Sequence, residues 1–214
     1  MRFSETVDRL AVLPEILPAP ADVLMPVVVG GSDRRPPPRR PLAGTGRAAA
    51  VLVLLFPDDA GDTSVVLIER PTADGHHHSG EVSFPGGKAE VDDVDPVATA
   101  LREAAEEVGL DPVEAGVRVI GLLDRLWIPV SDFDVTPVVA LAERRPAMVA
   151  APAEVVRIVT PPVARFLPDA PVEMVERTIR DWPLRYGAYA IDGLSVWGAT
   201  ARILSQLGMV LTRP

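Results

Sequence analysis

The amino-acid sequence predicts a fold of the α/β class, of the α+β kind, in which a mixed β-sheet lies between helices. Apolar runs of strand length recur along the chain and are interrupted by segments with apolar residues at helical spacing. With 214 residues, of which 48% are hydrophobic, the chain can bury one sizeable core. We therefore expect one main domain over residues 47–214, and an N-terminal extension over residues 1–46 that is packed on this domain or linked to it.

The N-terminal extension combines a short helix with a proline-rich segment. Residues 3–11 have the pattern of an amphipathic helix with Ser4 as its N-cap. Residues 14–46 are rich in proline and glycine, and the three prolines at 36–38 favour extended polyproline backbone. Positive charge is dense in this segment because it holds four arginines: Arg34, Arg35, Arg39 and Arg40. The segment is either a solvated linker or an arm that meets a phosphate-bearing ligand or a partner subunit.

Strands and one closing helix account for most of the main domain. The longest apolar run, residues 48–56, predicts a buried strand. Pro137 is expected to mark an edge or a bulge of the sheet. Residues 194–208 have apolar residues at helical spacing and end in a glycine, which predicts a packing helix. The other predicted strands cover residues 63–70, 117–129, 134–143 and 154–162.

Composition and charge limit the classes of function. The chain has no cysteine, which excludes disulfides and thiolate–metal sites and favours a reducing, cytoplasmic location. The start of the chain lacks the apolar stretch of a secretory signal, and the run 48–56 is too short to cross a bilayer, so no membrane partner is expected. A net charge of −9 disfavours nucleic-acid binding. Anionic small molecules remain suitable substrates if a bridging metal ion screens their charge.

A strongly acidic helix is predicted over residues 97–108. Asp95 is a suitable N-cap, Pro96 fits the first helical position, and Gly109 suits the C-terminal end. The expected apolar stripe consists of Val97, Leu101, Ala104, Ala105 and Val108. The opposite side is expected to carry three glutamates within about a third of the circumference: Glu103, Glu106 and Glu107.

These glutamates destabilise the helix unless their charge is compensated. Glu103 and Glu107 are a like-charge pair at i,i+4, which costs roughly 0.2 to 0.5 kcal/mol, and Arg102 is the neighbouring positive charge in the helix. One interpretation is a solvated acidic face, and the other is a Mg²⁺ or Mn²⁺ ion bound by the carboxylates. The preceding loop, Phe-Pro-Gly-Gly at residues 84–87, favours the second, because its glycines let a backbone carbonyl approach the ion. Such an ion can bridge two phosphates and lower the pKa of an attacking water.

A spaced motif connects this glycine loop with the acidic helix. Gly87 is followed after five residues by Asp93, and residues 102–110 read REAAEEVGL. This pattern resembles the Nudix box of Nudix hydrolases, which reads Gly, five residues, Glu, seven residues, then Arg-Glu, an aliphatic residue, any residue, Glu-Glu, any residue, Gly and an aliphatic residue. Here Asp93 stands in place of the first glutamate, and eight residues instead of seven separate it from Arg102.

The extra residue resembles the coenzyme A pyrophosphatase branch of that family. An upstream signature of the branch ends in Gly, three residues and Phe-Pro-Gly-Gly, as residues 80–87 do here. Arg70 fits the first arginine of that signature, whereas its second arginine is missing and His76 stands near that place. Residues 66–68 and Pro71 also depart from the signature, and VWGATARIL near the C-terminus resembles the closing helix of the branch. The resemblance spans most of residues 47–208.

The resemblance implies a Nudix fold and hydrolysis, dependent on Mg²⁺ or Mn²⁺, of a nucleoside diphosphate linked to another group. In the coenzyme A branch, coenzyme A or an acyl-coenzyme A is cut to 3′,5′-ADP and (acyl-)4′-phosphopantetheine. By position, the implied metal ligands are Glu103, Glu106, Glu107 and the carbonyl of Gly86. Arg102 would orient the acidic side chains, and Glu103 or the downstream Glu154 would activate the water.

Three further residues are candidates for contacts with substrate. Arg70 is a candidate because it belongs to the upstream signature. His78, or His76 in the same run of three histidines, can meet a phosphate, although a polar loop is the simpler interpretation. Trp127 can stack on adenine, although an aromatic residue in an apolar strand more often belongs to the core.

Alternatives to a coenzyme A hydrolase remain open at this point. One is a Nudix hydrolase that acts on ADP-ribose or a dinucleotide. The other is a non-catalytic Nudix-fold module that binds a ligand, although the three box glutamates and Arg102 are all present. The oligomeric state, including a homodimer, is left open by the sequence.

Overall fold

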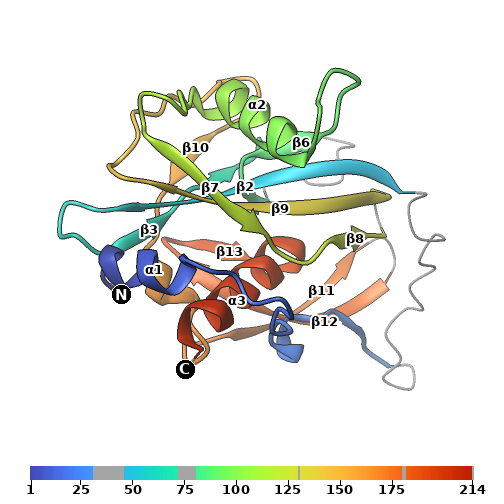
Figure 1. Ribbon diagram of the computed structural model, residues 1–214. Helices are drawn as coiled ribbons and strands as arrows, with labels where there is room; N and C mark the ends of the chain where they lie inside the picture. The colour runs from blue at the N-terminus through green and yellow to red at the C-terminus, as the bar shows by residue number, and fades with distance from the viewer. Residues whose placement is uncertain (31–45, 72–80, 130, 180–181, 214) are drawn as a thin grey trace.

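The computed structural model describes residues 1–30, 46–71, 81–129, 131–179 and 182–213. These residues form three α-helices and three sheets (Figure 1). The prolines at 36–38, the four arginines beside them, and His76 to His78 lie outside the described residues. The helices are α1 (Phe3–Leu10), α2 (Pro96–Val108) and α3 (Gly198–Thr212), and two short 3₁₀ turns are η1 (Asp22–Leu24) and η2 (Val163–Phe166).

A mixed six-stranded sheet forms the centre of the molecule. Its order is β3 (Thr63–Val65), β2 (Arg47–Pro57), β9 (Phe133–Ala142) and β7 (Val117–Leu122), with β6 (Gly86–Lys88) also beside β2 and β8 (Leu126–Ile128) also beside β9. β2 and β9 are parallel, and the other pairs are antiparallel.

Two smaller sheets complete the strands. One has the order β10 (Arg157–Val159), β4 (Leu67–Glu69) and β5 (Val82–Ser83). The other has the order β1 (Val27–Val28), β12 (Trp182–Ile191) and β11 (Glu173–Ile179), with β13 (Leu194–Val196) paired to β12.

The alternating side chains of β2 divide the core into two layers. Leu52 and Leu54 point to one face and pack with Ala104 of α2. Val53 and Leu55 point to the other face, in the cluster that contains residues of α1, α3 and β12. Successive residues of a strand point to opposite faces, so an uninterrupted apolar run is what a strand covered on both sides requires. Figure 1 shows α2 above the central sheet and α1 and α3 below it, which confirms the predicted mixed sheet between helices.

The N-terminal residues contribute to this second layer. Leu10 of α1 and Leu24 of η1 are fully buried. The hydroxyls of Thr6 and Thr63 form a buried hydrogen bond of 2.7 Å. Gln206 of α3 donates to the Pro18 carbonyl (3.0 Å), so the segment after α1 is held against α3. Residues 1–30 are therefore packed into the same body as the sheet.

Two predicted strands are each divided in the structure. Residues 63–70 form β3 and β4, which belong to different sheets. Residues 117–129 form β7 and β8, because the chain leaves β9 between them and the Asp124 N–H donates instead to Gln206 Oε1 (3.1 Å). Residues 154–162, predicted as one strand, keep only the three residues of β10 in the sheet.

Pro137 lies in β9, between β2 and the β7/β8 pair, so the expectation of a sheet edge is wrong. The expectation of a bulge is confirmed, because residues 123–125 face only residues 136–137 between the pairs Leu122–Val138 and Leu126–Val135. The Pro137 carbonyl accepts from Leu123 N–H (3.0 Å), in the interval between β7 and β8. The backbone N and O of a strand residue face the same neighbouring strand, so the missing N–H of Pro137 also faces the interval between β7 and β8. The sheet therefore loses no regular strand-to-strand hydrogen bond at this proline.

Two helix boundaries also differ from the prediction. Ser4 lies inside α1, whose N-cap is Arg2, and no side chain caps the helix there. Residues 194–196 form β13, and α3 begins at Gly198. Gly208 does not end α3 but lies within it, where a Cβ atom would come 2.3 Å from the Phe166 carbonyl oxygen. This glycine serves close packing of η2 on α3.

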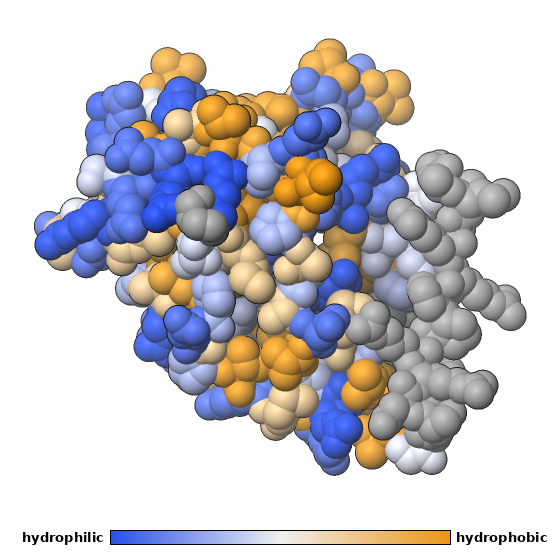
Figure 2. Space-filling view, turned by 60° about the horizontal axis from the view of Figure 1, so that its bottom comes forward, coloured by the Kyte–Doolittle hydropathy of each residue, from blue (hydrophilic) through white to orange (hydrophobic). Residues whose placement is uncertain are grey.

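The surface mixes polar and apolar residues. On the face shown in Figure 2, hydrophobic residues form small separate groups among hydrophilic ones. Across the described residues, none of the helices has the length and apolar composition needed to cross a membrane.

Candidate active site

Helix α2 presents the glutamates, and its ends are fixed by local chemistry. The Ala98 N–H donates to Asp95 Oδ1 (2.8 Å), Pro96 is the first helical residue, and Gly109 ends the helix in the left-handed conformation at φ 63°. The predicted cap, start and end of this helix are confirmed. The three carboxylates therefore have a defined position along the helix.

The face of α2 that is buried differs from the predicted stripe. Ala104 and Val108 are buried as expected, but Ala105 is exposed and Glu107 is buried. The expectation that all three glutamates lie on the side away from the core is therefore wrong for Glu107. The reason lies in tertiary contacts: β6 and Arg70 provide polar partners for the Glu107 carboxylate. Helical spacing alone predicts a solvent-exposed charge at this position.

Glu107 is held by two partners in a nearly dry environment. Its side chain is 2% exposed, its Oε2 accepts from the Gly86 N–H (2.8 Å), and its Oε1 lies 2.9 Å from Arg70 Nη2. Burial raises the pKa of the Glu107 carboxyl to about 7, while Arg70 and the Gly86 N–H act in the opposite direction. The repulsion of Glu103 and Glu154 adds to the rise.

This raised pKa makes stability depend on pH in the metal-free protein. A carboxyl with a higher pKa in the folded state stabilises the fold when protonated, below about 4.5, and this contribution is lost as the pH rises to about 7. We expect the free energy of unfolding of the wild type, relative to Glu107→Gln, to fall by about 3 kcal/mol across this window. Urea denaturation of both proteins in a chelator between pH 4.5 and 8 measures the difference. A difference that stays constant over the whole range would contradict the assigned shift.

Glu103 lies against the glycine loop. A Cβ atom at residue 87 would come 2.6 Å from the Glu103 carboxylate, so any larger residue there would displace this carboxylate from its present position. At Gly86, which has a φ of 151°, a Cβ atom would come 2.4 Å from the Ala50 carbonyl oxygen. The Glu103 side chain is 15% exposed, and burial raises its pKa against the opposing effect of Arg102. Gly87 thus makes room for the Glu103 carboxylate and Gly86 lets β6 lie close to β2, whereas the approach of a backbone carbonyl to a metal ion stays a prediction.

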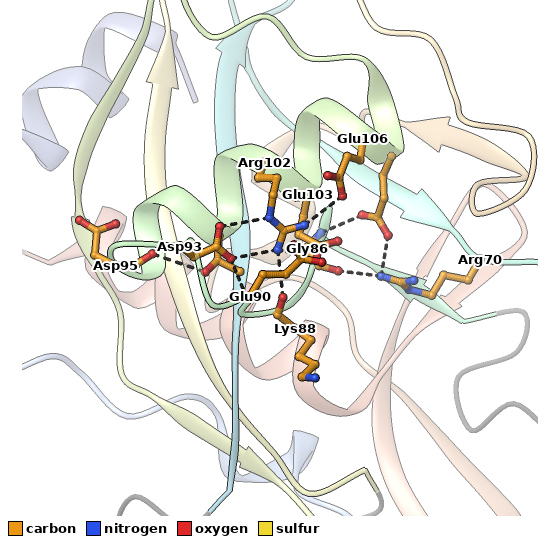
Figure 3. A network of polar contacts seen from close by, with 11 residues as sticks. Arg70, Gly86, Lys88, Glu90, Asp93, Asp95, Arg102, Glu103 and Glu106 are labelled. Atoms are coloured by element: carbon orange, nitrogen blue, oxygen red, sulfur yellow. Dashed lines mark hydrogen bonds and ion pairs between the residues drawn. The ribbon is translucent and has the colours of Figure 1, made fainter.

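Arg102 joins the loop to the helix (Figure 3). It contacts Asp93 through two bonds, Nε to Oδ1 (3.1 Å) and Nη2 to Oδ2 (3.0 Å), and Nη2 also donates to the Lys88 carbonyl (3.0 Å). On the helix it reaches Glu103 Oε1 (3.1 Å) and the exposed Glu106 Oε2 (3.0 Å). The paired guanidinium holds the pKa of Asp93 well below its usual range. Asp93 therefore occupies the position of the box glutamate as an ionised partner of Arg102.

Arg70 approaches the same group from the other end of the network in Figure 3. Its Nε donates to Ser83 Oγ (3.1 Å), and its Nη2 donates to the Gly86 carbonyl (2.9 Å) in addition to pairing with Glu107. Arg70 was predicted as a contact to substrate, and its position beside Gly86 and Glu107 was not foreseen. Ser83 was not predicted at all, because a serine in an extended stretch carries no signal of its own.

The donor set is suited to a hard divalent cation, although the carboxylates are divided between two arginines. Among the described residues, no group of three or more His, Cys, Asp or Glu side chains is arranged to hold a metal ion. Glu103 and Glu106 are drawn to Arg102, and Glu107 is drawn to Arg70. Their oxygens are nevertheless the ligand type that Mg²⁺ and Mn²⁺ prefer, and burial raises the pKa of both Glu103 and Glu107, a cost that a bound cation offsets.

The other predicted residues lie in different places. Glu154 is exposed, but its charge acts on Glu107, so it lies at the margin of the site. Trp127 is on β8, which β9 and β2 separate from β6, and its Nε1–H donates to Asp132 Oδ1 (3.0 Å). The structure therefore does not bring Trp127 to the glycine loop. His78 lies outside the described residues.

A cavity of about 360 Å³ lies beside the site, against the N-terminal half of α2. Its lining includes Asp93, Thr99, Thr136, Leu122 and small side chains at the start of β2, but none of the three box glutamates. The glutamates thus do not line the cavity. Asp93 connects the two places, because it lines the cavity and also pairs with Arg102, the partner of Glu103 and Glu106.

Several known proteins with similar sequences are named as Nudix hydrolases. The chain is 38% identical over 174 residues to "Nudix hydrolase 22, chloroplastic" of Arabidopsis thaliana, which covers 77% of this chain and 55% of that protein. It is 36% identical over 172 residues to "Uncharacterized Nudix hydrolase NudL" of Pectobacterium atrosepticum, which covers 78% of this chain and 83% of that protein. The chain thus spans little more than half the length of the plant relative and most of the bacterial one.

A solved structure and a family model complete the comparison. The crystal structure of a Nudix hydrolase from M. smegmatis, RenU, is 25% identical with a TM-score of 0.46, and covers 56% of this chain and 72% of that chain. A model of the NUDIX domain matches residues 46–173, which include the glycine loop, α2 and most of the central sheet. The chain belongs to the NUDIX domain family.

Proposed function

We propose that this protein is a divalent-metal-dependent hydrolase of nucleoside diphosphate derivatives, and that it prefers coenzyme A or acyl-coenzyme A. The hydrolase activity is inferred from the placement of Glu103 and Glu107. Their carboxylates are withdrawn from solvent, and they lie against a glycine loop and beside two arginines. Family membership and the names of the relatives support this activity.

The metal would be held by Glu103, Glu106, Glu107 and the Gly86 carbonyl. Bound there, Mg²⁺ or Mn²⁺ supplies charge neutralisation for the diphosphate and lowers the pKa of a water molecule. Glu103 is the preferred group to accept the proton of that water, because it lies against the glycine loop and burial raises its pKa, which makes the carboxylate a stronger base. Glu154 remains the second candidate for this role, since it lies within electrostatic reach of Glu107.

The residues of the chain divide the remaining tasks. Arg102 orients Glu103 and Glu106 through its contacts with Asp93 and the Lys88 carbonyl. Arg70, which is 29% exposed, can turn toward an oxygen of the diphosphate. Water forms a new bond to one phosphorus, the bridging P–O bond breaks, and the two products are phosphate monoesters.

The choice of coenzyme A depends on the signature that runs from Arg70 to Gly87. Arg70 and the Phe-Pro-Gly-Gly loop, the two ends of that signature, are in direct contact through the Gly86 carbonyl. The two ends of the signature therefore meet next to the carboxylates. His78 and Trp127 stay candidates for contacts with the nucleotide, although Trp127 requires a substrate that reaches across the sheet.

A substrate panel tests the proposal. With Mg²⁺ or Mn²⁺ we expect coenzyme A, free or acylated, to be hydrolysed to 3′,5′-ADP with a higher kcat/KM than ADP-ribose or a dinucleotide, because Arg70 and the Phe-Pro-Gly-Gly loop, the two ends of the signature, resemble the coenzyme A branch. Product analysis by anion-exchange chromatography at equal substrate concentrations measures the preference. A clear preference for ADP-ribose would overturn the choice of substrate, whereas no turnover of any member of the panel would favour the non-catalytic binding module.

The proposal includes a small-molecule partner and a cytoplasmic location. A net charge of −9 disfavours a nucleic-acid partner, and the absence of cysteine suits a reducing compartment. A homodimer remains an expectation that rests on the sequence alone.

A further inference from the structure

One nitrogen of Arg70 occupies a position between two proposed metal ligands. Arg70 Nη2 lies 2.9 Å from Glu107 Oε1 and 2.9 Å from the Gly86 carbonyl oxygen. Both oxygens belong to the four groups assigned above to the divalent cation. In the described structure a single guanidinium therefore contacts two oxygens that are also proposed ligands of the metal ion.

The backbone of Arg70 is held in a strand ladder, whereas its side chain is partly exposed to solvent. The Arg70 N–H donates to the Glu81 carbonyl (3.0 Å), which continues the pairing of β4 with β5. The guanidinium is anchored through Nε to Ser83 Oγ (3.1 Å). Its side chain is 29% exposed, whereas that of Glu107 is 2% exposed, so the arginine reaches the carboxylate from the solvent side. The guanidinium can thus leave without any movement of the strand.

The two cations exclude each other at this place. A guanidinium and a divalent ion that contact the same carboxylate oxygen repel at short range, in surroundings where charges are weakly screened. Without either cation, an ionised Glu107 would be a buried charge whose remaining compensation is the Gly86 N–H. An ionised Glu107 therefore needs a positive group beside it before the metal arrives, and a different arrangement afterwards.

We propose that Arg70 is an exchangeable internal cation, which holds Glu107 and the Gly86 carbonyl in the metal-free protein and is displaced when the divalent ion binds. This inference rests on the proposed function, because it takes the metal ligands from there. Arg70 is then a positioning residue in the free protein, and its guanidinium becomes available to the substrate only after the metal is bound. Metal and substrate binding are coupled through this one side chain.

Direct measurement of metal binding tests this exchange. Mn²⁺ binding to the metal-free full chain is followed by electron paramagnetic resonance at pH 8.5, without substrate, for the wild type, Arg70→Met and Arg157→Met. Arg157 is the matched control, because it is an arginine of the same small sheet that pairs with Glu69 (2.6 Å) outside the site. We expect Arg70→Met to bind Mn²⁺ roughly 5- to 150-fold more tightly than the wild type, the usual range for coupled equilibria, and Arg157→Met to bind like the wild type.

A second variant and a spectroscopic signal keep the test decisive if Arg70→Met does not fold. Ser83→Ala removes the anchor of the guanidinium and keeps its charge, and we expect tighter Mn²⁺ binding than in the wild type, but a smaller gain. In wild-type protein with ¹⁵N-labelled arginine, titration with Mg²⁺ is expected to shift the Nε–H signal of Arg70. Equal or weaker Mn²⁺ binding in the two site variants, or an unmoved Arg70 signal at saturating Mg²⁺, overturns the exchange. Absence of Mn²⁺ binding in every protein overturns the proposed metal-dependent function itself.

Discussion

Replacing Glu103 by glutamine is expected to lower kcat by about 10²- to 10⁴-fold, the usual contribution of a general base. Glutamine keeps the size of the side chain and can keep the contact with Arg102, but it cannot accept the proton of the attacking water. It is also a weaker metal ligand than a carboxylate, which is why the metal ion is kept at saturation. Burial raises the pKa of the Glu103 carboxyl, so we expect a neutral side chain at this position to be tolerated by the fold. Steady-state kinetics with saturating Mg²⁺, together with thermal unfolding of the same sample, measures both effects.

Glu154→Gln is the matched comparison for this variant. Both residues were candidates for the general base, but Glu103 contacts Arg102 and lies against Gly87, whereas Glu154 is exposed. We expect Glu154→Gln to retain most of the wild-type kcat. A large loss in Glu154→Gln with activity retained in Glu103→Gln would transfer the base to Glu154.

Arg102→Lys is expected to reduce kcat by about 10- to 100-fold, although the charge is conserved, which is the range observed when partners of metal ligands are removed. Arg102 uses three nitrogens to reach Asp93, Glu103, Glu106 and the Lys88 carbonyl at the same time. A lysine ammonium is a compact group and cannot span these four partners. The glutamates would then lose their common orientation, and kcat should fall more than KM rises.

Arg118→Lys is a suitable control, because Arg118 is exposed on β7, at the far side of the central sheet from β6. We expect its kinetics to equal those of the wild type. If Arg102→Lys retained wild-type kcat and the same ratio of kcat to KM, Arg102 would have no orienting role, and its network would serve stability alone.

Features that depend on neighbouring residues were predictable from the sequence. Asp95, Pro96 and Gly109 set the ends of α2 through capping and backbone geometry, and these rules act within one turn of the helix. The buried strand β2 followed from an apolar run that needs cover on both faces. The two adjacent glycines predicted a close approach at residues 86 and 87, and the structure shows one to β2 and to the Glu103 carboxylate.

Features that depend on distant residues were not predictable. The burial of Glu107 is decided by the Gly86 N–H and Arg70, which are 21 and 37 positions away in the sequence, and helical spacing contains no information about them. At the break between β7 and β8, the Asp124 N–H finds its acceptor in Gln206, 82 positions away in the sequence. Trp127 satisfied the sequence criteria for a stacking residue, but the strand order places two strands between it and the glycine loop.

The packing of α1 and α3 on the underside of the sheet has a consequence for how this protein can change. The motif-bearing stretch, residues 46–173, and the stretches that complete the lower hydrophobic layer are different parts of the chain. Substitutions at Leu10, Leu24 or Leu207 can therefore alter resistance to heat or denaturant while they leave the reactive groups chemically intact. The stability of the fold can to that extent be changed by substitution without changing the residues proposed for catalysis.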